Sequence, residues 1–565
     1  MDWIADRLSS LPELTLFLCL ALGYSLGSFK VKGFGLGTVV GTLVVALVLG
    51  QAGVRVDPFS KTVFFALFMF ATGYEVGPEF FRGLRTGGLQ MVVMSITFCL
   101  VGLGAVLLMS RIFGFDPGLS AGLLSGALTQ SSAIGTATDA IQRMSIPDAT
   151  KQLWISHIAI GDAATYLFGA AGVMVFLTKI VPKIAGFDLR EECRKYEEEL
   201  EGAEGEGSFN AFVPIEVQAL RLEEKHFIGK RVGETADALS SDQGRLCIQQ
   251  IRRGRRLFEP HRSEILREGD TIVLTGRRKI LLDAQPQIGP PVVDNEAMDI
   301  PFEIVSIVVT NRQFAGKKLR EISKSTNPGS LHLRRIFRQG QQMPAFPNTR
   351  IERGDVLELI GRSEDIDHVG KVIGYVDRPR DNSDVTFLGL AIAVGALVGF
   401  FALELGGIPI SLGTGGGVLL AGLVFGWLHS VRPRWGRIPR PAVWLMQTLG
   451  LNTFVALVGL GAASHVVEAL KHQGVPLVTA GIVVSMLPNI AVFLVGWYGF
   501  RMNGGILVGA CAGAGTATPA LSTALEDSES RVPALGYTIP YALSNVLLTL
   551  WGPVVVALTP LGELK

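Results

Sequence analysis

Long apolar stretches dominate both ends of the chain, and a long polar segment separates them. A helix that crosses a bilayer needs roughly 20 mostly apolar residues. Five stretches before the polar segment and five after it approach that length. The pattern therefore predicts an α-helical polytopic membrane protein, with membrane helices over 12–29, 36–54, 61–81, 89–112, 152–179, 385–403, 412–428, 442–464, 476–500 and 535–558.

Each apolar end also contains one stretch that small polar residues interrupt, over 118–140 and 504–524. The interruption reads Gly-Ala-Leu-Thr-Gln-Ser-Ser-Ala at 126–133 and Gly-Ala-Gly-Thr-Ala-Thr-Pro-Ala at 513–520. Hydrophobic segments broken at corresponding places in two halves are the best sequence indication of a transporter's binding site. The pair predicts a transporter whose substrate binds at the two breaks.

The composition fits a membrane protein. Of the 565 residues, 48% are hydrophobic and 18% are charged, whereas soluble domains carry roughly 25% charged residues. The formal net charge of +1 gives no reason to expect a nucleic-acid partner. Asp2, Asp6 and Glu13 precede the first apolar stretch, which is the reverse of a basic signal-peptide start. We therefore expect that stretch to remain as a membrane helix.

The two apolar ends match one another in order. The matched positions include Leu36-Gly37-Thr38 with Leu412-Gly413-Thr414, Thr129 with Thr516, and Gly169 with Gly552. The last match places Asp162 on Asn545. An ordered series of this kind predicts that the membrane region is an internal repeat.

Lysine and arginine are expected in excess on the cytoplasmic side of a membrane. If the N-terminus lies outside and each broken stretch is a re-entrant hairpin, the inner side carries twice as many of these residues as the outer side. The strongest group lies between Arg432 and Arg440. Five crossings and one hairpin per half then give two inverted repeats with both termini outside. The alternative is that both broken stretches span fully, which gives parallel repeats and places the arginine group outside.

The polar segment predicts an inserted cytoplasmic α+β tandem. Gly229-Lys-Arg-Val-Gly-Glu234 resembles Gly316-Lys-Lys-Leu-Arg-Glu321, and the stretch 267–276 resembles 352–361. Each unit has the alternation of short strands around a turn glycine. The predicted divisions are a first membrane repeat over 1–185, an acidic linker over 186–207, soluble domains over 208–290 and 291–380, and a second membrane repeat over 381–565.

The two breaks carry the predicted substrate site. A helix broken inside a membrane offers backbone N–H groups and a positive dipole end, which favour a carboxylate. Hydroxyl and amide side chains would add hydrogen-bond donors. The candidate substrate-binding residues at the breaks are Thr129, Gln130, Ser131, Ser132, Thr516, Thr518 and Pro519. The alternative is that these small residues only allow close helix packing.

Ionisable residues within the apolar stretches are further candidates, because a charge inside a membrane is costly. Asp162, with Asn545 at its aligned place, could contact the substrate, carry a coupling proton or serve structure alone. Glu75, Glu79 and Arg82 share one helix face by their spacing. They predict either a gate or charge relay, or an interfacial ion cluster.

Other chemistry has little sequence support. The five cysteines are scattered and the eight histidines do not cluster with them, so we expect no metal and no cofactor. We find no nucleophile elbow or phosphate-binding loop and therefore predict no enzyme activity. The basic run Arg252-Arg-Gly-Arg-Arg256 is more typical of a solvated hairpin or lipid contact than of a nucleic-acid site.

The duplicated phrase, with Val532-Pro-Ala-Leu-Gly-Tyr537 and Ser544-Asn-Val-Leu-Leu-Thr549, resembles the aspartate:alanine exchanger family of bacterial inner-membrane transporters. The insert resembles paired TrkA C-terminal domains. The resemblance implies a homodimeric antiporter that exchanges aspartate for alanine, or glutamate or succinate, with a possible small-molecule effector on the insert. The family's Thr-x-x-Pro carries over onto Thr516 and Pro519, whereas Ser132 replaces the proline after Thr129. The alternative function is a TrkA-C-regulated cation channel or cation/proton antiporter.

Overall fold

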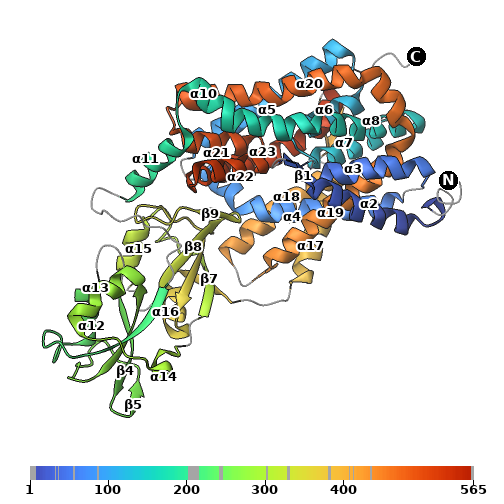
Figure 1. Ribbon diagram of the computed structural model, residues 1–565. Helices are drawn as coiled ribbons and strands as arrows, with labels where there is room; N and C mark the ends of the chain where they lie inside the picture. The colour runs from blue at the N-terminus through green and yellow to red at the C-terminus, as the bar shows by residue number, and fades with distance from the viewer. Residues whose placement is uncertain are drawn as a thin grey trace. The chain divides into compact units, whose positions relative to one another are not determined.

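A computed structural model describes residues 8–31, 34–35, 37–54, 57–85, 88–201, 215–240, 246–300, 303–326, 331–378, 383–405, 408–411, 413–432 and 435–560 (Figure 1). The chain forms two compact units, Met1–Arg194 with Arg380–Lys565, and Lys195–Pro379. The first is helical and the second contains two β-sheets with helices. The prediction of a polytopic helical protein with an inserted α+β region is confirmed. The end of the predicted linker, 202–207, lies outside the described residues.

The helical unit repeats one order of elements. The first half contains α2 (Pro12–Ser28), α3 (Thr38–Leu49), α4 (Pro58–Arg85), α5 (Leu89–Phe113), α6 (Pro117–Ala127), α7 (Ser132–Arg143) and a long helix that runs from α8 (Asp148–Leu167) through η2 (Phe168–Gly172), α9 (Val173–Val175) and η3 (Phe176–Ile180) to α10 (Val181–Ala185). The second half contains α17 (Val385–Phe400), α18 (Gly413–Val431), α19 (Arg440–Ala462), α20 (Val466–Leu494), α21 (Gly504–Ala514), α22 (Thr518–Ser528) and α23 (Val532–Leu558). A two-stranded β-hairpin follows the first helix of each half, β1 (Lys30–Val31) with β2 (Phe34–Gly35), and β12 (Ala402–Leu405) with β13 (Ile408–Ser411).

All ten predicted membrane helices are present as helices. By length and composition, six helical segments in the described part of the chain could cross a membrane: Leu89–Phe113, Asp148–Ala185, Gly413–Val431, Arg440–Ala462, Lys471–Gly499 and Val532–Leu558. Among the other predicted crossings, α2, α3 and α17 are shorter apolar helices. The helix α4 has 28 residues but carries Glu75, Glu79 and Arg82.

The pair α6 and α7 forms a re-entrant hairpin, hereafter hairpin 1. Gly118 and Gly122 in α6 lie against the backbone of Trp154 and Ile158, so α6 and α8 begin at the same end. Only the short segment 144–147 joins α7 to α8, so α7 ends near the beginning of α6. The pair α21 and α22, hairpin 2, is built in the same way, because α21 packs along the start of α23 and α22 leads directly into α23.

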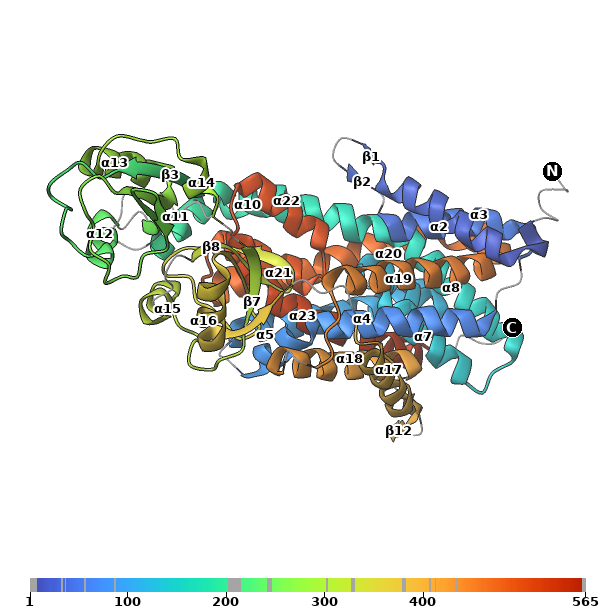
Figure 2. The same ribbon diagram turned by 90° about the horizontal axis from the view of Figure 1, so that it is seen from below.

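The hairpins enter from opposite ends of the helical unit. Along the helix Asp148–Ala185, α6 packs on the first half, whereas α21 and α22 contact η3 near its other end. Figure 1 shows α6 and α7 toward one end of the unit and α21 and α22 toward the other, and Figure 2 shows the same separation of α7 from α21 and α22. Hairpins at opposite ends of repeated halves are the arrangement of an inverted repeat.

Packing divides the helical unit into two bodies. The helices α2, α3 and α4 pack densely with α17, α18 and α19, and we call this group the frame. The remaining helices, with both hairpins, pack densely on one another and form the core. Contacts between frame and core are sparser and come mainly from α19 with α8, α4 with α23, and α18 with α7.

The structure corrects the predicted alignment of α8 with α23. Gly126 in hairpin 1 lies against the carbonyl of Asp162, whereas its counterpart Gly513 lies against the carbonyl of Tyr537. Asp162 therefore corresponds to Tyr537 and not to Asn545. In the same register Tyr166 corresponds to Tyr541. The sequence alignment relied on Gly169 and Gly552, and these two glycines pack against different parts of hairpin 1.

The inserted unit contains two sheets that share one order of four strands, and the second sheet has an additional edge strand, β11. The first is β3-β6-β4-β5, with β3 (Ile215–Arg221), β4 (Cys247–Arg253), β5 (Arg256–Phe258) and β6 (Thr271–Arg277). The second is β11-β7-β10-β8-β9, with β7 (Glu303–Val309), β8 (His332–Arg338), β9 (Gln341–Met343), β10 (Val356–Gly361) and β11 (Gly374–Asp377). The helices of this unit are α12 (Val232–Leu239), α13 (Arg278–Ile288), α14 (Asn295–Met298), α15 (Leu319–Thr326) and α16 (Ser363–Ile373), while α11 (Leu189–Glu201) crosses the boundary between the units.

A Gly-Asp pair recurs in the two similar stretches of the insert, as Gly269-Asp270 and Gly354-Asp355. The aspartate of each pair forms an ion pair with an arginine of its own sheet. Arg253 donates to both carboxylate oxygens of Asp270, at 2.9 Å each, and Arg338 makes the same bidentate contact with Asp355 at 2.7–2.8 Å. The hydrogen bond to Asp270 raises the pKa of Arg253. Arg252 likewise binds Asp294 and lowers the pKa of that carboxyl group. These arginines of the basic run therefore serve the domain's own structure.

Candidate substrate-binding site

The turn of each hairpin has the same unusual backbone. Thr129 and Thr516 have φ values of 52° and 50°, a left-handed conformation that is uncommon for threonine. In hairpin 1 the amide of Gln130 donates to the carbonyl of Ser125 at 2.7 Å, and in hairpin 2 the amide of Ala517 donates to that of Ala512 at 2.8 Å. Strained backbone of this kind persists where the surroundings fix it, as at ligand sites.

The two turns meet each other. The hydroxyl of Thr129 donates to the carbonyl oxygen of Gly515 at 3.3 Å, and the hydroxyl of Thr516 donates to that of Leu128 at 3.4 Å. The bonds are reciprocal, since each threonine contacts the residue that precedes the other. The duplicated phrase therefore brings two distant parts of the chain to one point inside the helical unit.

A polar cavity of about 270 Å³ opens beside this contact, between frame and core. The core contributes Thr129, Gln130, Ser131, Ser132, Tyr166, Thr516, Tyr541 and Asn545. The frame contributes Thr38, Val39, Phe68, Thr72, Gln447, Thr448, Leu451 and Asn452. These described lining residues are neutral, with many hydroxyl and amide groups. The helices α7 and α22 begin at the turns, which directs their positive dipole ends to the same region.

Polar side chains bind hairpin 1 to α23. Gln130 Nε2 lies 3.2 Å from Asn545 Oδ1 and 3.0 Å from Thr549 Oγ1. Thr136 donates to the carbonyl oxygen of Thr549 at 2.8 Å, and Ser132 contacts the Thr549 hydroxyl. Gln130, Ser131 and Ser132 are all buried. This network closes hairpin 1 against the core.

The corresponding residues of hairpin 2 are more exposed than those of hairpin 1. Thr518 and Pro519 are exposed and do not line the cavity. The Thr518 hydroxyl is 2.9 Å from the hydroxyl of Tyr537, and Pro519 occupies the first turn of α22. Of the predicted residues in hairpin 2, the structure therefore places only Thr516 at the cavity.

Asp162 and Asn545, which the sequence aligned with each other, lie in different surroundings. Asn545 lines the cavity and contacts Gln130. Asp162 is fully buried against α6, where Ser125 lies 2.7 Å from its Oδ1, and it does not line the cavity. A direct contact between Asp162 and a substrate in the cavity is therefore not supported by this conformation.

The three charged residues predicted as a group on α4 also lie in two different places. Glu79 and Arg82 form a buried salt bridge of 2.7 Å away from the cavity. Glu75 accepts a hydrogen bond of 2.6 Å from Gln447, which does line the cavity. Glu75 is thus placed to orient the Gln447 carboxamide, whereas Glu79 and Arg82 are placed to hold the end of α4.

Comparisons with known sequences agree with this architecture. The family profile described as a predicted permease membrane region, that of the aspartate:alanine exchangers, matches residues 15–182 and 387–557 and so includes both hairpins. The chain belongs to the aspartate:alanine exchanger family. A TrkA-C domain profile matches residues 304–374, a range that contains strands β8, β9 and β10 and nearly all of β7 in the second sheet of the insert.

Curated relatives of this exchanger-family chain match over nearly its full length. An uncharacterized transporter from Bradyrhizobium diazoefficiens is 40% identical over 91% of this chain and 100% of its own. An uncharacterized transporter from Bordetella parapertussis is 37% identical over 99% of this chain and 98% of its own length. One from Shewanella oneidensis is 35% identical over 98% of this chain and 99% of its own length. No solved structure matches the chain. The chain is therefore a multi-pass membrane protein of a transporter family.

Several residues that line the cavity of this exchanger-family member were not predicted from the sequence. Tyr166 and Tyr541 line the cavity from equivalent positions of α8 and α23. Their common signal is a glycine five residues earlier, Gly161 and Gly536, each of which packs tightly on its hairpin. Asn452, which accepts from Thr42 at 3.1 Å, has no counterpart in the other half that could have revealed it.

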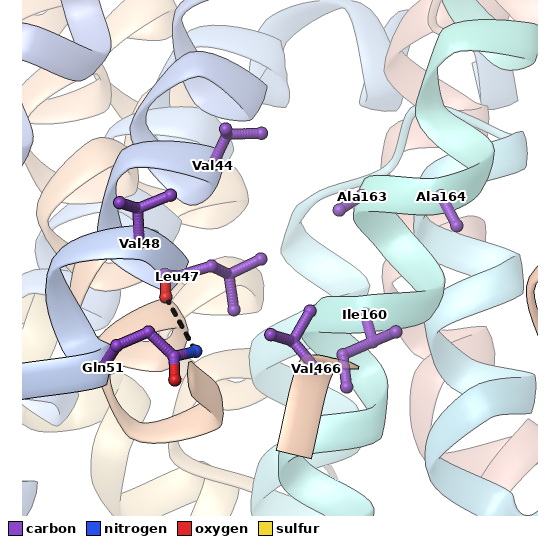
Figure 3. A pocket seen from close by; sticks show the side chains of 8 residues that line it. All are labelled: Val44, Leu47, Val48, Gln51, Ile160, Ala163, Ala164 and Val466. Carbon is purple, nitrogen blue, oxygen red and sulfur yellow. Dashed lines mark hydrogen bonds between the residues drawn. The ribbon is translucent and has the colours of Figure 1, made fainter. Parts of the chain in front are cut away.

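A second, larger cavity of about 630 Å³ lies between α3 and α8 (Figure 3). Its lining is aliphatic apart from Gln51, whose side-chain nitrogen contacts the carbonyl oxygens of Leu47 at 3.4 Å and Ala463 at 2.5 Å. Figure 3 shows Val44, Leu47 and Val48 on one side and Ile160, Ala163 and Ala164 on the other. Aliphatic walls offer no donors for a carboxylate, so the smaller polar cavity is the better candidate for an exchanger's substrate site.

Proposed function

We propose that this protein is a secondary antiporter that exchanges small carboxylates or amino acids, such as aspartate for alanine, or glutamate or succinate, at the cavity between the two hairpin turns. The reciprocal contact of Thr129 and Thr516 beside a neutral, hydroxyl-lined cavity is the observation that carries this proposal. In transporters with inverted repeats, half-helix N-termini meet anionic groups and half-helix C-terminal ends meet cations. Both kinds of helix end converge here, which suits a zwitterionic amino acid.

The division into frame and core supports a mechanism of alternating access. The cavity takes one wall from each body, and contacts between the bodies are sparse. Movement of the core relative to the frame would expose the cavity to each side of the membrane in turn, as rocking of one bundle does in related architectures. A volume of about 270 Å³ suits a metabolite smaller than a drug-sized ligand.

The charge pattern supports a proposed location. We place the protein in a bacterial inner membrane with the insert in the cytoplasm, because the arginine-rich segment between Arg432 and Arg440 then lies inside. The insert, with its TrkA-C match, is proposed to bind a small effector that sets the transport rate. Addition of candidate effectors to the full-length transporter, with exchange as the readout, tests this role.

Counterflow in proteoliposomes tests the proposed function. Vesicles loaded with aspartate, alanine, glutamate or succinate are diluted into the labelled substrate, and exchange predicts transient accumulation. A regulated cation channel or cation/proton antiporter, which the TrkA-C match favours, predicts potassium or sodium flux without any amino acid. Cation flux together with no counterflow for any of the four solutes would contradict the antiporter.

A further inference from the structure

Asp162 is a buried carboxyl group that the proposed substrate cavity does not use. It lies on α8, one turn before the cavity residue Tyr166, and has no exposed surface. The Ser125 hydroxyl on α6 is 2.7 Å from Oδ1. Oδ2 has no hydrogen-bond partner among the described residues. A buried polar atom without a partner in a native structure needs an explanation.

The elements packed on Asp162 present neutral groups to it. The α6 surface consists of Gly122, Ser125 and Gly126, and α20 packs Gly481 against the neighbouring Thr165. Tyr166 is the titratable side chain that interacts with Asp162, and no charged side chain of the described residues compensates it. An ionised carboxylate without a cation in such surroundings is strongly destabilised.

The contacts of the Ser125 hydroxyl fit a neutral carboxyl group. The single Ser125 hydroxyl has two acceptors in reach, Asp162 Oδ1 at 2.7 Å and the carbonyl oxygen of Gly122 at 3.1 Å. With an ionised Asp162 the hydroxyl can satisfy only one of them. With a protonated Asp162 the carboxyl O–H donates to Ser125 and Ser125 donates to Gly122. Both contacts are then hydrogen bonds.

The second repeat indicates what changes when hairpin 1 opens. Tyr537 stands where Asp162 stands, and its hydroxyl contacts Thr518 on the exposed arm of hairpin 2. Because the repeats are inverted, the opposite-facing state would give hairpin 1 the open surroundings that hairpin 2 has here. An aspartate is shorter than a tyrosine and would leave room for water beside Ser131. Water stabilises the ionised form of a carboxyl group.

We propose that Asp162 is a proton-binding site coupled to alternating access. It holds a proton while hairpin 1 is closed, donates that proton to water when hairpin 1 opens, and takes one up from water before hairpin 1 closes again. The ligand of this site is H⁺, and the proposal rests on the proposed antiport. Each cycle of exchange then requires one proton to bind again to Asp162. The exchange rate therefore falls as the pH rises above the pKa that Asp162 has while hairpin 1 is open.

Two measurements on the full-length protein test the proposal. The first is the pH profile of counterflow for the wild type, Asp162→Asn and the control Asp148→Asn, whose carboxylate lies on the same helix and is 94% exposed. We expect the wild type and the control to lose about tenfold per pH unit on the alkaline limb, as a one-proton step does. Asp162→Asn, a neutral isostere, should give a profile without that limb.

The second measurement does not depend on transport. The infrared spectrum at neutral pH should contain a carbonyl band of a buried protonated carboxyl group that Asp162→Asn removes and Asp148→Asn retains. A band that persists in Asp162→Asn, or an alkaline limb unchanged by that substitution, would overturn the proposal. If no solute gives counterflow, the antiport itself fails, and the infrared band still decides whether Asp162 holds a proton.

Discussion

The two hairpins have the same backbone conformation at their turns but differ in the side-chain contacts that attach them to the core. Both turns place a threonine at positive φ, and each threonine donates to the other hairpin. Yet Ser131 and Ser132 are buried, whereas their counterparts Thr518 and Pro519 are exposed. The positions that the two phrases share therefore specify the turn, and the positions at which they differ decide how each hairpin is held.

Side-chain chemistry accounts for the difference. Hairpin 1 meets α23 through Gln130 and Ser132, which contact Asn545 and Thr549. The counterparts on hairpin 2 are Ala517 and Pro519, and those of Asn545 and Thr549 are Ala170 on η2 and Met174 on α9. Apolar residues cannot form such a network, so hairpin 2 lacks this means of attachment.

The largest expected contrast is in accessibility. Cysteines introduced at Thr518 and Pro519 should react readily with a water-soluble thiol reagent, whereas those at Ser131 and Ser132 should be protected. Of the five native cysteines, Cys19, Cys99, Cys193 and Cys511 are buried and Cys247 is half-buried, so replacement of Cys247 limits background labelling. Equal labelling of both hairpins would contradict the difference in closure.

Removal of the Gln130 amide should have the next largest effect. Gln130→Ala leaves Asn545 and Thr549 with unmet hydrogen bonds, at a cost of about 1–3 kcal/mol. Counterflow should fall roughly five- to 150-fold and Ser131→Cys should become reactive in that background. The matched control is Ala517→Gly on hairpin 2, which removes no hydrogen bond and should leave Ser131→Cys protected.

The reciprocal threonines should respond alike. Thr129→Val and Thr516→Val keep the shape and each remove one hydroxyl, worth about 0.5–1.5 kcal/mol, so substrate KM should rise roughly two- to tenfold in both. Thermal unfolding of the purified variants controls for loss of structure. A large effect for one threonine with none for the other would show that only one turn serves the site.

The smallest expected effect concerns the far arm of each hairpin. Asp139 on α7 accepts a hydrogen bond of 3.4 Å from the amide of Gly415 in the frame, whereas its counterpart Glu526 on α22 is exposed. Asp139→Asn should slow exchange by about two- to fivefold, since the bond is long. Glu526→Gln should change it little, as surface substitutions usually do. The reverse order would argue against Asp139 as a contact between frame and core.

The sequence was sufficient for the helices and for the two turns, because apolar length and the repeated phrase depend on local residues. It misplaced Asp162, because the alignment relied on Gly169 and Gly552, whose packing differs in the two halves. It also missed Gln447 and Asn452, since the frame wall of the cavity has no repeated signature. A cavity between two bodies depends on tertiary packing, which periodicity alone does not encode.

Cross-linking of the two turns tests the central claim most directly. Thr129→Cys and Thr516→Cys, in a background without the native cysteines, should form a disulfide on mild oxidation, because the two side chains reach across to the opposite turn at 3.3 Å and 3.4 Å. A proteolytic cut within the insert should then leave the two halves of the chain covalently joined, and counterflow should stop until reduction. Halves that separate under the same oxidation, with counterflow unchanged, would contradict a site built where the hairpins meet.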